Sequence, residues 1–502
     1  MTNEKSRREF LKGTAWMGVA AAAAGCMTRG SGCGAESGGS MALYADKPFK
    51  KLRIGVIGCV RGRTGVRNFA AIPGCEVTAI CDLSPSVIKR ALNILKEKGQ
   101  KNPPKVYTGA EDEWKKLCDD PNVDLVYNAT PWQLHVPIAL YAMNAGKHVA
   151  TEVPGAFTVE QCWELVETSE RLRRHCMQLE NCCYGEAEML MLNLVRKGVL
   201  GEIVHGEGAY IHDLRIGNYA PWEEDKTGGD GFWNYWRLRH NAQHGGNQYP
   251  THGLGPICNC MNINRGDCFD YLVSLESEQR NFEAYAKASF PADSWQAKLK
   301  VAMADMNTTL IKTKLGRSIM IQHDVSSPRP YSRINRVTGT KGAFEGIELP
   351  GMDEKDASML VTNACPCRFG WEERPGAGVH GYFDKEKTEE MRRKYAHPLW
   401  AQAGDLAFKM GGHGGMDFMM ILRLAYCLQN GMPLDQNVYD LASWSCICEL
   451  SEKSVRNRSA ALDIPDFTRG AWKTAKPFSP EAIDPAKLNL EGVGNAGEQY
   501  KI

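Results

Sequence analysis

The first half of the chain alternates short apolar runs with amphipathic segments. The apolar runs are typical of parallel strands; they are Leu52–Gly58, Glu76–Asp82, Asp124–Pro131, Lys147–Pro154 and Met177–Asn181. Helices are expected from near Thr64 past Phe69, from Trp132 onwards, and over residues 158–174. This alternation predicts a doubly wound α/β domain with a parallel sheet, and we assign residues 49–180 to it.

The second half, residues 181–502, has the pattern of a separate sheet domain. Asn307–Lys314 and Arg317–His323 alternate apolar and polar positions and are joined through Gly316, which predicts a hairpin. Residues 437–456 are expected to form one amphipathic helix. Residues 351–410 are polar and aromatic without a clear period, and we expect an irregular lid or an arm of a homo-oligomer.

Residues 1–48 are predicted to be an export signal and a linker. Arg7 and Arg8 precede a short apolar stretch, Thr14–Gly25, as in twin-arginine signals. A basic N-terminus before a poor helix is the alternative. Ala23–Cys26 faintly resembles a lipoprotein cleavage site, which would put a lipid on Cys26. Residues 27–48 are expected to be flexible. The twin-arginine route carries folded proteins, so we expect a periplasmic protein that binds its cofactor before export.

Composition narrows the classes of protein further. The 502 residues include 60 Lys+Arg against 59 Asp+Glu, and a net charge of +1 argues against nucleic acid as a partner. No apolar run approaches the roughly 20 residues of a membrane span. The 18 cysteines form no Cys-x-x-Cys pair. We therefore expect them to be small core residues rather than metal ligands, and we predict no metal site.

A glycine turn follows the first strand. Gly58–Gly62 is followed by a predicted helix and a second strand that ends in Asp82, which is the Rossmann order. The helix N-terminus would attract a pyrophosphate, and Asp82 would bind the adenosine ribose and favour NAD over NADP. Val60 stands where a second glycine is usual. A βαβ unit without nucleotide is the alternative, and Arg61 would either neutralise a phosphate or be a solvated loop charge.

These motifs resemble the Gfo/Idh/MocA oxidoreductase superfamily. The similarity rests on the glycine turn, on Asn128–His135 (Asn-Ala-Thr-Pro-Trp-Gln-Leu-His) and on Glu152-Val153-Pro154. The resemblance implies a Rossmann domain followed by a C-terminal α/β domain with an open, mostly antiparallel sheet. Most dehydrogenases of that superfamily have lysine where this chain has Val153. Valine cannot transfer a proton, which argues against a plain sugar dehydrogenase.

Longer blocks in the second half are more specific and closely resemble glycoside hydrolase family 109. They include Gly246–Pro256 (with Tyr-Pro-Thr-His), His323–Ser332 and Gly412–Asp417. The resemblance implies tightly bound NAD and α-N-acetylgalactosaminidase activity, with a small-molecule or glycan substrate. It also implies a cofactor site formed by Val60, Arg61, Asp82, Trp132, Gln133, Leu134, His135, Glu152, Val153 and Asn181. The implied sugar site consists of Tyr210, Arg237, Tyr249, Pro250, Thr251, His252 and Tyr331.

The residues themselves are compatible with these roles. Tyr249 and His252 lie three apart at the start of a probable helix, so their side chains can converge and exchange protons with a sugar. Packing is the alternative for Tyr210, and cation–π packing is the alternative for Arg237. His212 and His413 would either join the site or lie outside it.

The family resemblance implies a redox-neutral cycle. NAD oxidises sugar C3, a base removes the C2 proton, the glycosidic group leaves C1, water adds, and C3 is reduced again. No free NAD is consumed, which suits an exported enzyme. We predict Tyr249 and His252 as the acid and base, with their order open. An exported redox-neutral sugar oxidoreductase of the glucose–fructose type and a non-catalytic sugar-binding relative are the rival readings.

Overall fold

The computed structural model describes residues 39–222, 231–346 and 367–477, together with positions 480, 482–488 and 490. The predicted twin-arginine signal and Cys26 lie outside the described residues. Within the described ranges, no helix combines the length and the apolar character that crossing a bilayer would require.

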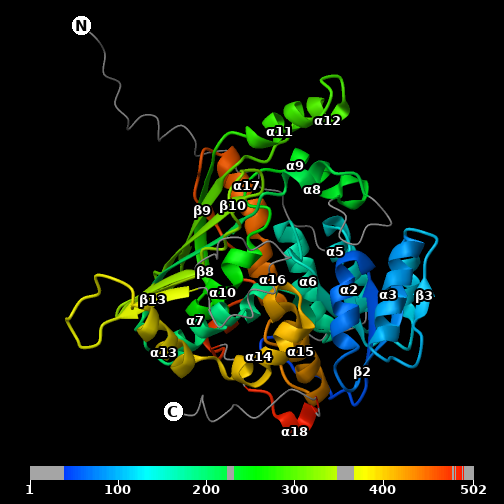
Figure 1. Ribbon diagram of the computed structural model, residues 1–502, viewed down its shortest axis with the longest axis horizontal. Coiled ribbons are helices and arrows are strands. Elements are labelled where there is room, and N and C mark those ends of the chain that lie inside the picture. The colour runs from blue at the N-terminus through cyan, green and yellow to red at the C-terminus, as the bar shows by residue number, and fades with distance from the viewer. Residues whose placement is uncertain are drawn as a thin grey trace, which may run out of the picture. The chain divides into compact units, whose positions relative to one another are not determined.

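A six-stranded parallel sheet occupies the first part of the chain, with the order β3-β2-β1-β4-β5-β6. Figure 1 shows helices α2 and α3, which pack against each other on this part of the molecule, in blue on the right. Its strands are β1 Leu52–Ile57, β2 Cys75–Cys81, β3 Lys105–Tyr107, β4 Leu125–Asn128, β5 His148–Thr151 and β6 Cys176–Gln178. The helices between them are α2 Cys59–Phe69, α3 Pro85–Glu97, α4 Glu113–Asp119, α5 His135–Asn144 (after η1 Trp132–Leu134) and α6 Val159–Leu172. The predicted Rossmann sheet is confirmed.

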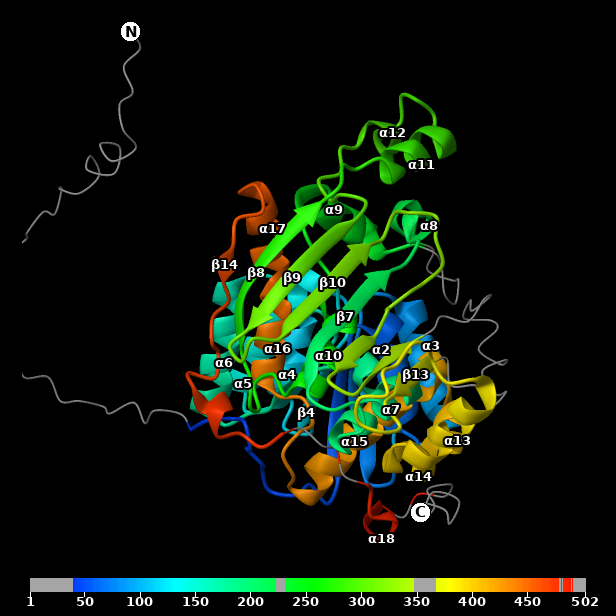
Figure 2. The same ribbon diagram turned by 90° about the vertical axis from the view of Figure 1, so that its left-hand side faces the viewer.

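The second half of the chain forms an eight-stranded sheet, with the order β13-β12-β11-β7-β10-β9-β8-β14. Its strands are β7 Ile203–Ile211, β8 Phe269–Glu276, β9 Asn307–Thr313, β10 Ser318–Asp324, β11 Arg336–Gly339, β12 Gly342–Gly346, β13 Cys367–Trp371 and β14 Leu462–Asp463. Among these described strands only β7 and β10 pair in parallel. Figure 2 shows β8, β9, β10 and β7 side by side, with α16 and α17 behind them. The expected mostly antiparallel sheet is confirmed.

Helices of the second half connect and cover the two sheets. They are η2 Asn181–Tyr184, α7 Glu186–Arg196, α8 Arg215–Tyr219, η3 Trp233–Tyr235, α9 Trp236–Gln243, α10 Thr251–Met261, α11 Asn281–Ser289, α12 Trp295–Lys298, α13 Lys385–Tyr395, α14 Pro398–Met410, η5 His413–Gly415, α15 Met416–Asn430, α16 Val438–Ser445, α17 Ile447–Arg456, η6 Ala471–Lys473 and α18 Pro485–Leu488. Helix α15 packs on α2 and β1, and α16 packs on α6 and β6. The C-terminal helices therefore return to the Rossmann sheet and share one hydrophobic core with it.

Most cysteines behave as the sequence predicted. No disulfide joins any of the described cysteines, and all of them except Cys75 are buried. Burial raises the pKa of Cys176 and Cys260 to about 12, because a thiolate would lose its hydration there. These thiols fill core space as small apolar side chains.

Several predicted boundaries are wrong. Helix α2 begins at Cys59 rather than near Thr64, because the chain turns at Gly58 alone. The single helix expected over 437–456 is two helices that meet at Cys446. The part of 351–410 that the structure describes is not irregular, because it contains β13, α13 and α14.

The expected flexible linker is also wrong over its last ten residues. Met41 is buried in the core, and its backbone N–H donates to the Tyr439 hydroxyl at 3.0 Å. Asp46 lies 2.9 Å from His148 Nε2 and 3.3 Å from Arg174. The segment is tied to the Rossmann sheet by these specific contacts.

A close backbone approach positions the second half of the site. Helix α10 crosses β7 where two glycines face each other: a Cβ on Gly208 would lie 2.1 Å from the Gly253 carbonyl oxygen, and a Cβ on Gly253 would lie 2.3 Å from the Ala209 nitrogen. Only glycine permits this contact. It brings Tyr210 on β7 beside His252 on α10, with ring centroids 5.3 Å apart.

Replacing Gly253 should therefore damage the fold and the site together. We expect Gly253→Ala to lower the free energy of unfolding by about 1–3 kcal/mol, because the clashing atoms belong to the backbone and cannot rotate away. Chemical denaturation measures the change. Gly381→Ala is the control, since its Cβ would meet nothing within 4 Å. Equal stability of the two variants would contradict the role given to this contact.

Candidate active site

The glycine turn after β1 forms one wall of a large cavity. Gly58 has φ +80°, and a Cβ there would lie 2.6 Å from the Ala129 carbonyl oxygen on the neighbouring β4 loop. Helix α2 follows directly, and its N-cap residue Gly58 makes no side-chain hydrogen bond to it. The Cys59 N–H donates to the Asp82 carboxylate at 2.7 Å. The positive end of the helix at this turn fits an anionic group such as a pyrophosphate.

Asp82 occupies the predicted position at the end of β2. Burial raises the pKa of its carboxyl group, while hydrogen bonds from the Ser84 and Cys59 N–H groups oppose that shift. Both bonds orient the carboxylate at the cavity wall. The position suits hydrogen bonds from the hydroxyl groups of a nucleotide ribose.

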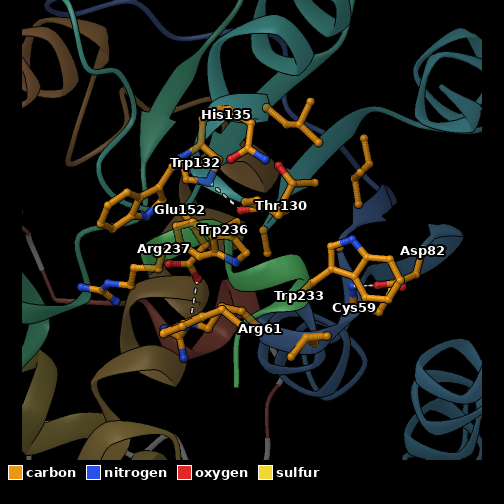
Figure 3. Close-up of a pocket in the computed structure, with 18 of the residues that line it drawn as sticks. Cys59, Arg61, Asp82, Thr130, Trp132, His135, Glu152, Trp233, Trp236 and Arg237 are labelled. Carbon is orange, nitrogen blue, oxygen red and sulfur yellow. Dashed lines mark hydrogen bonds and ion pairs between the residues drawn. The ribbon is translucent and has the colours of Figure 1, made fainter. Parts of the chain in front are cut away.

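The cavity is large enough for a dinucleotide together with a sugar. Its volume is about 1020 Å³. Every residue predicted for the cofactor site lines it, as do Tyr210, Arg237, Tyr249 and His252. Figure 3 places Asp82 and Cys59 at one end, and Trp132, His135, Glu152 and Arg237 at the other. Pro250, Thr251 and Tyr331 are not among the described lining residues; Tyr331 instead packs against Tyr210 and His212.

Trp132 and His135 brace the wall between β4 and β5. The Trp132 indole N–H donates to the Val153 carbonyl at 3.1 Å. The two His135 ring nitrogens face the Pro154 and Thr130 carbonyl oxygens at 2.8 and 2.9 Å. These residues line the predicted cofactor site and also fix the position of its backbone.

Arg61 is not a solvated loop charge, because its guanidinium is bound by two carboxylates of the protein. Its Nε donates to Glu152 at 3.0 Å, and its two terminal nitrogens donate to Asp417 at 3.1 and 3.2 Å. Burial would lower the pKa of this guanidinium, but the two carboxylates hold the pKa well above its ordinary value. Two protein anions therefore already balance its charge.

Asp417 is a functional candidate that sequence reasoning missed. This fully buried carboxylate also accepts hydrogen bonds from Asn181 Nδ2 at 2.6 Å and His413 Nδ1 at 2.8 Å. Burial opposes its ionisation, but Arg61 and His413 keep its pKa well below the ordinary value. Its place in the Gly412–Asp417 block was the available signal, yet two of its partners, Arg61 and Asn181, come from distant parts of the chain.

Aromatic rings and one arginine line the predicted sugar end. The Tyr249 ring lies 4.4 Å from the Tyr210 ring and 4.8 Å from the His252 ring, measured between centroids. Arg237 packs over Trp132 and Tyr249 at 4.8 and 5.3 Å, so the cation–π alternative is present. Its Nε and Nη2 are buried without a hydrogen-bond partner. Those donors are suited to the oxygens of a bound ligand.

Burial sets the protonation of this cluster. It raises the pKa of the Tyr249 hydroxyl well above its ordinary value, so Tyr249 carries its proton at neutral pH. The His212 ring accepts or donates a hydrogen bond with the Tyr210 hydroxyl at 3.2 Å, and burial lowers the pKa of His212 to about 4. His413 lines the cavity, whereas His212 is not among its described lining residues.

His252 has a carboxylate partner that the sequence did not reveal. Its Nδ1 lies 2.8 and 2.9 Å from the two oxygens of Glu180, which is fully buried. Burial opposes ionisation of Glu180, but the charge and hydrogen bonding of His252 lower its pKa below the ordinary value. An ionised Glu180 fixes the proton on Nδ1 and leaves Nε2 as the basic nitrogen.

A metal could in principle use Glu180, Cys182 and His252, whose ligand atoms lie within 4.8 Å of one another. The carboxylate and the imidazole are already paired, however. Burial also raises the pKa of the Cys182 thiol well above its ordinary value, which opposes the thiolate that a metal needs. The donor set favours a hydrogen bond between the carboxylate and the imidazole.

Comparison with known proteins accounts for both halves of the chain. Residues 52–179 match "Oxidoreductase family, NAD-binding Rossmann fold", and residues 184–474 match "Glycosyl hydrolase 109, C-terminal domain". Among solved structures, levoglucosan dehydrogenase in complex with NADH and levoglucosan has a TM-score of 0.58 at 17% identity, covering 83% of this chain and 100% of that chain. An oxidoreductase domain protein from Kribbella flavida has a TM-score of 0.61 at 18% identity, covering 83% and 100%. These likenesses show the fold.

Sequence relatives are much closer. A "Glycosyl hydrolase family 109 protein" of Shewanella woodyi is 45% identical over 443 residues, which is 87% of this chain and 89% of that protein. An "Alpha-N-acetylgalactosaminidase" of Bacteroides fragilis is 46% identical over 431 residues, 86% of this chain and 95% of that protein. With an NAD-binding Rossmann domain joined to a family-specific second domain, this chain belongs to glycosyl hydrolase family 109.

Proposed function

We propose that the protein hydrolyses terminal α-N-acetylgalactosamine with the help of NAD that stays bound. The observation that carries this proposal is one continuous cavity, which joins Asp82 to Tyr249 and to His252, the partner of Glu180. The name of the Bacteroides fragilis relative supports the choice of sugar. NAD bound in this cavity would supply transient oxidation of the sugar at C3 and would end each cycle in its starting state.

The chain's own groups would move the protons. His252, held by Glu180, would accept a proton through Nε2, and the C2 proton beside a C3 carbonyl is the group most in need of a base. Tyr249, whose buried hydroxyl stays protonated, would donate to a sugar oxygen. Arg237 would orient the sugar through its buried donors.

The usual glycosidase arrangement has little support here. It requires two carboxyl groups across the scissile bond, one acting as acid and the other as nucleophile or base. In this cavity Glu152 is paired with Arg61, and Asp82 is bound by backbone N–H groups at the other end. Glu180 is buried behind His252. A carbonyl-assisted elimination needs no such pair.

A sugar oxidoreductase of the glucose–fructose type is less favoured. Val153 lines the cavity where related dehydrogenases are expected to have lysine, and no lysine is among its described lining residues. Export through the twin-arginine route is part of the proposal, because Arg7, Arg8 and the apolar stretch after them have that pattern. Retained NAD would suit a compartment without a supply of free cofactor.

The first test is the reaction itself. In a panel of nitrophenyl glycosides in both anomers, nitrophenol should be released from the α-N-acetylgalactosaminide. Thioglycosides should also be cleaved, since the leaving group needs little protonation in this mechanism. Substrate turned over in D2O should gain deuterium at C2, as measured by NMR of the product. Product with hydrogen fully retained at C2 would indicate ordinary displacement and contradict the proposed chemistry.

The second test separates catalysis from cofactor binding. Tyr249→Phe and His252→Ala should each lower kcat by about 10²–10⁴-fold while NAD stays bound. Asp82→Ala should show the reverse pattern and lose its bound NAD. Tyr271→Phe and His205→Ala are matched controls, because neither residue is among those lining the cavity. Near-normal kcat in both Tyr249→Phe and His252→Ala would remove the catalytic assignment.

The third test concerns Glu180 as the residue that positions His252. Glu180→Gln keeps the side-chain volume but removes the charge that fixes the proton on Nδ1. We expect kcat to fall by about 10²–10⁴-fold, the cost of holding an imidazole in the wrong tautomer. Melting temperature and bound NAD should change little. Glu207→Gln, outside the cavity, is the control, and a kcat equal to that of this control would exclude the positioning role.

A further inference from the structure

The second domain contributes a tryptophan to the Rossmann end of the cavity. Trp233 belongs to η3, yet it lines the same cavity as Cys59, Asp82 and Leu83. Its side chain projects toward the end marked by Asp82 and Cys59, apart from Trp132, Glu152 and Arg237 (Figure 3). Nothing in the proposed sugar chemistry uses a residue at that end.

The exposed apolar surface at this end is unusual. Trp233 is 47% exposed, Leu83 is 43% exposed and Val60 is 42% exposed, and all three line the cavity. Large apolar side chains that remain open within a cavity indicate a surface that a ligand covers. Since Asp82 is placed to bind a ribose, the group attached to that ribose would meet these side chains.

The local backbone holds Trp233 in place. Asn234 and Tyr235 both have left-handed conformations, with φ of 48° and 51°, which residues other than glycine rarely adopt in succession. Arg239 stabilises the turn by donating to the Asn234 carbonyl at 2.9 Å and to its side-chain oxygen at 3.1 Å. The Trp222 ring packs edge-on at 6.2 Å. These contacts hold the turn that carries the indole and place the ring at the cavity wall.

We propose that Trp233 stacks on the adenine ring of the dinucleotide and so retains the cofactor between catalytic cycles. A flat heteroaromatic base would cover the open indole face while its ribose reaches Asp82. Both domains would then contribute to the cofactor site, the Rossmann domain through Asp82 and the second domain through Trp233. This inference rests on the proposed binding of NAD, and it does not depend on glycoside hydrolysis.

Cofactor release provides the test. Protein purified with its NAD is mixed with excess competing NADH, and the departure of the original NAD is followed by chromatography. Trp233→Ala should release NAD about 10- to 100-fold faster than the unchanged protein, the range expected for loss of one base-stacking contact. Trp233→Phe, which keeps an aromatic face, should recover most of the retention. It also provides a folded variant if the alanine variant is unstable.

A control and a pair of fragments identify the contact. Tyr271 on β8 is 39% exposed and is not among the cavity-lining residues, so Tyr271→Ala should release NAD at the unchanged rate. In Trp233→Ala, binding of AMP should weaken by the same factor as binding of NAD, and binding of nicotinamide mononucleotide should not change. Release equal to that of Tyr271→Ala would overturn the proposal. An equal loss for nicotinamide mononucleotide would place Trp233 at the other end and would also overturn it.

None of these measurements requires turnover. If the protein fails to cleave glycosides but Trp233→Ala still releases NAD faster, the proposed function fails and the stacking contact stands. If glycosides are hydrolysed but Trp233→Ala releases NAD at the unchanged rate, the stacking contact fails and the proposed function stands.

Discussion

The buried carboxylate of Asp417 is the constraint on which the arrangement of the site depends. It joins Arg61 in the first turn of α2, Asn181 after the Rossmann sheet and His413 of the C-terminal loop. An unpaired charge at this depth would cost several kcal/mol, so these partners must be brought together if Asp417 is to remain ionised. The cofactor turn and helix α15 are thereby held in one geometry.

Glycines make that geometry accessible. A Cβ on Gly412 would lie 2.8 Å from Asp417 Oδ2, and Gly415 has φ +92° at the start of α15. The loop can therefore approach the carboxylate closely enough for His413 to reach it. The same principle operates where α10 meets β7, and in both places the absence of a side chain allows two segments to bring their chemical groups together.

The two ends of the cavity are lined by chemically different side chains. Exposed apolar side chains and the Asp82 carboxylate lie at one end, while Tyr210, Tyr249 and His252 lie at the other. Burial keeps Tyr249 protonated, whereas the neighbouring imidazole keeps Glu180 ionised although this carboxylate is fully buried. Environment, more than residue type, thus determines which group carries a proton.

Local pattern was enough to predict five of the six Rossmann strands and the hairpin at Gly316, because these depend on the period of apolar residues and on glycine. It missed β3, a strand of three residues of which two are exposed. Resemblance to the family supplied Tyr249 and His252. The sequence did not predict the break at Cys446, since both helices are buried and their apolar pattern is continuous. It also did not predict the helices between 385 and 410, whose polar and aromatic composition conceals the helical period.

What the sequence by itself determined is the order of elements and the presence of the chemistry-bearing residues. Only the tertiary structure decided their partners: Arg61 with Glu152 and Asp417, and Glu180 with His252. These pairs join residues 72 to 356 positions apart. No local pattern records such a separation, because Asp417 reaches Arg61 only when α15 packs on α2, and Glu180 reaches His252 only when α10 packs on η2.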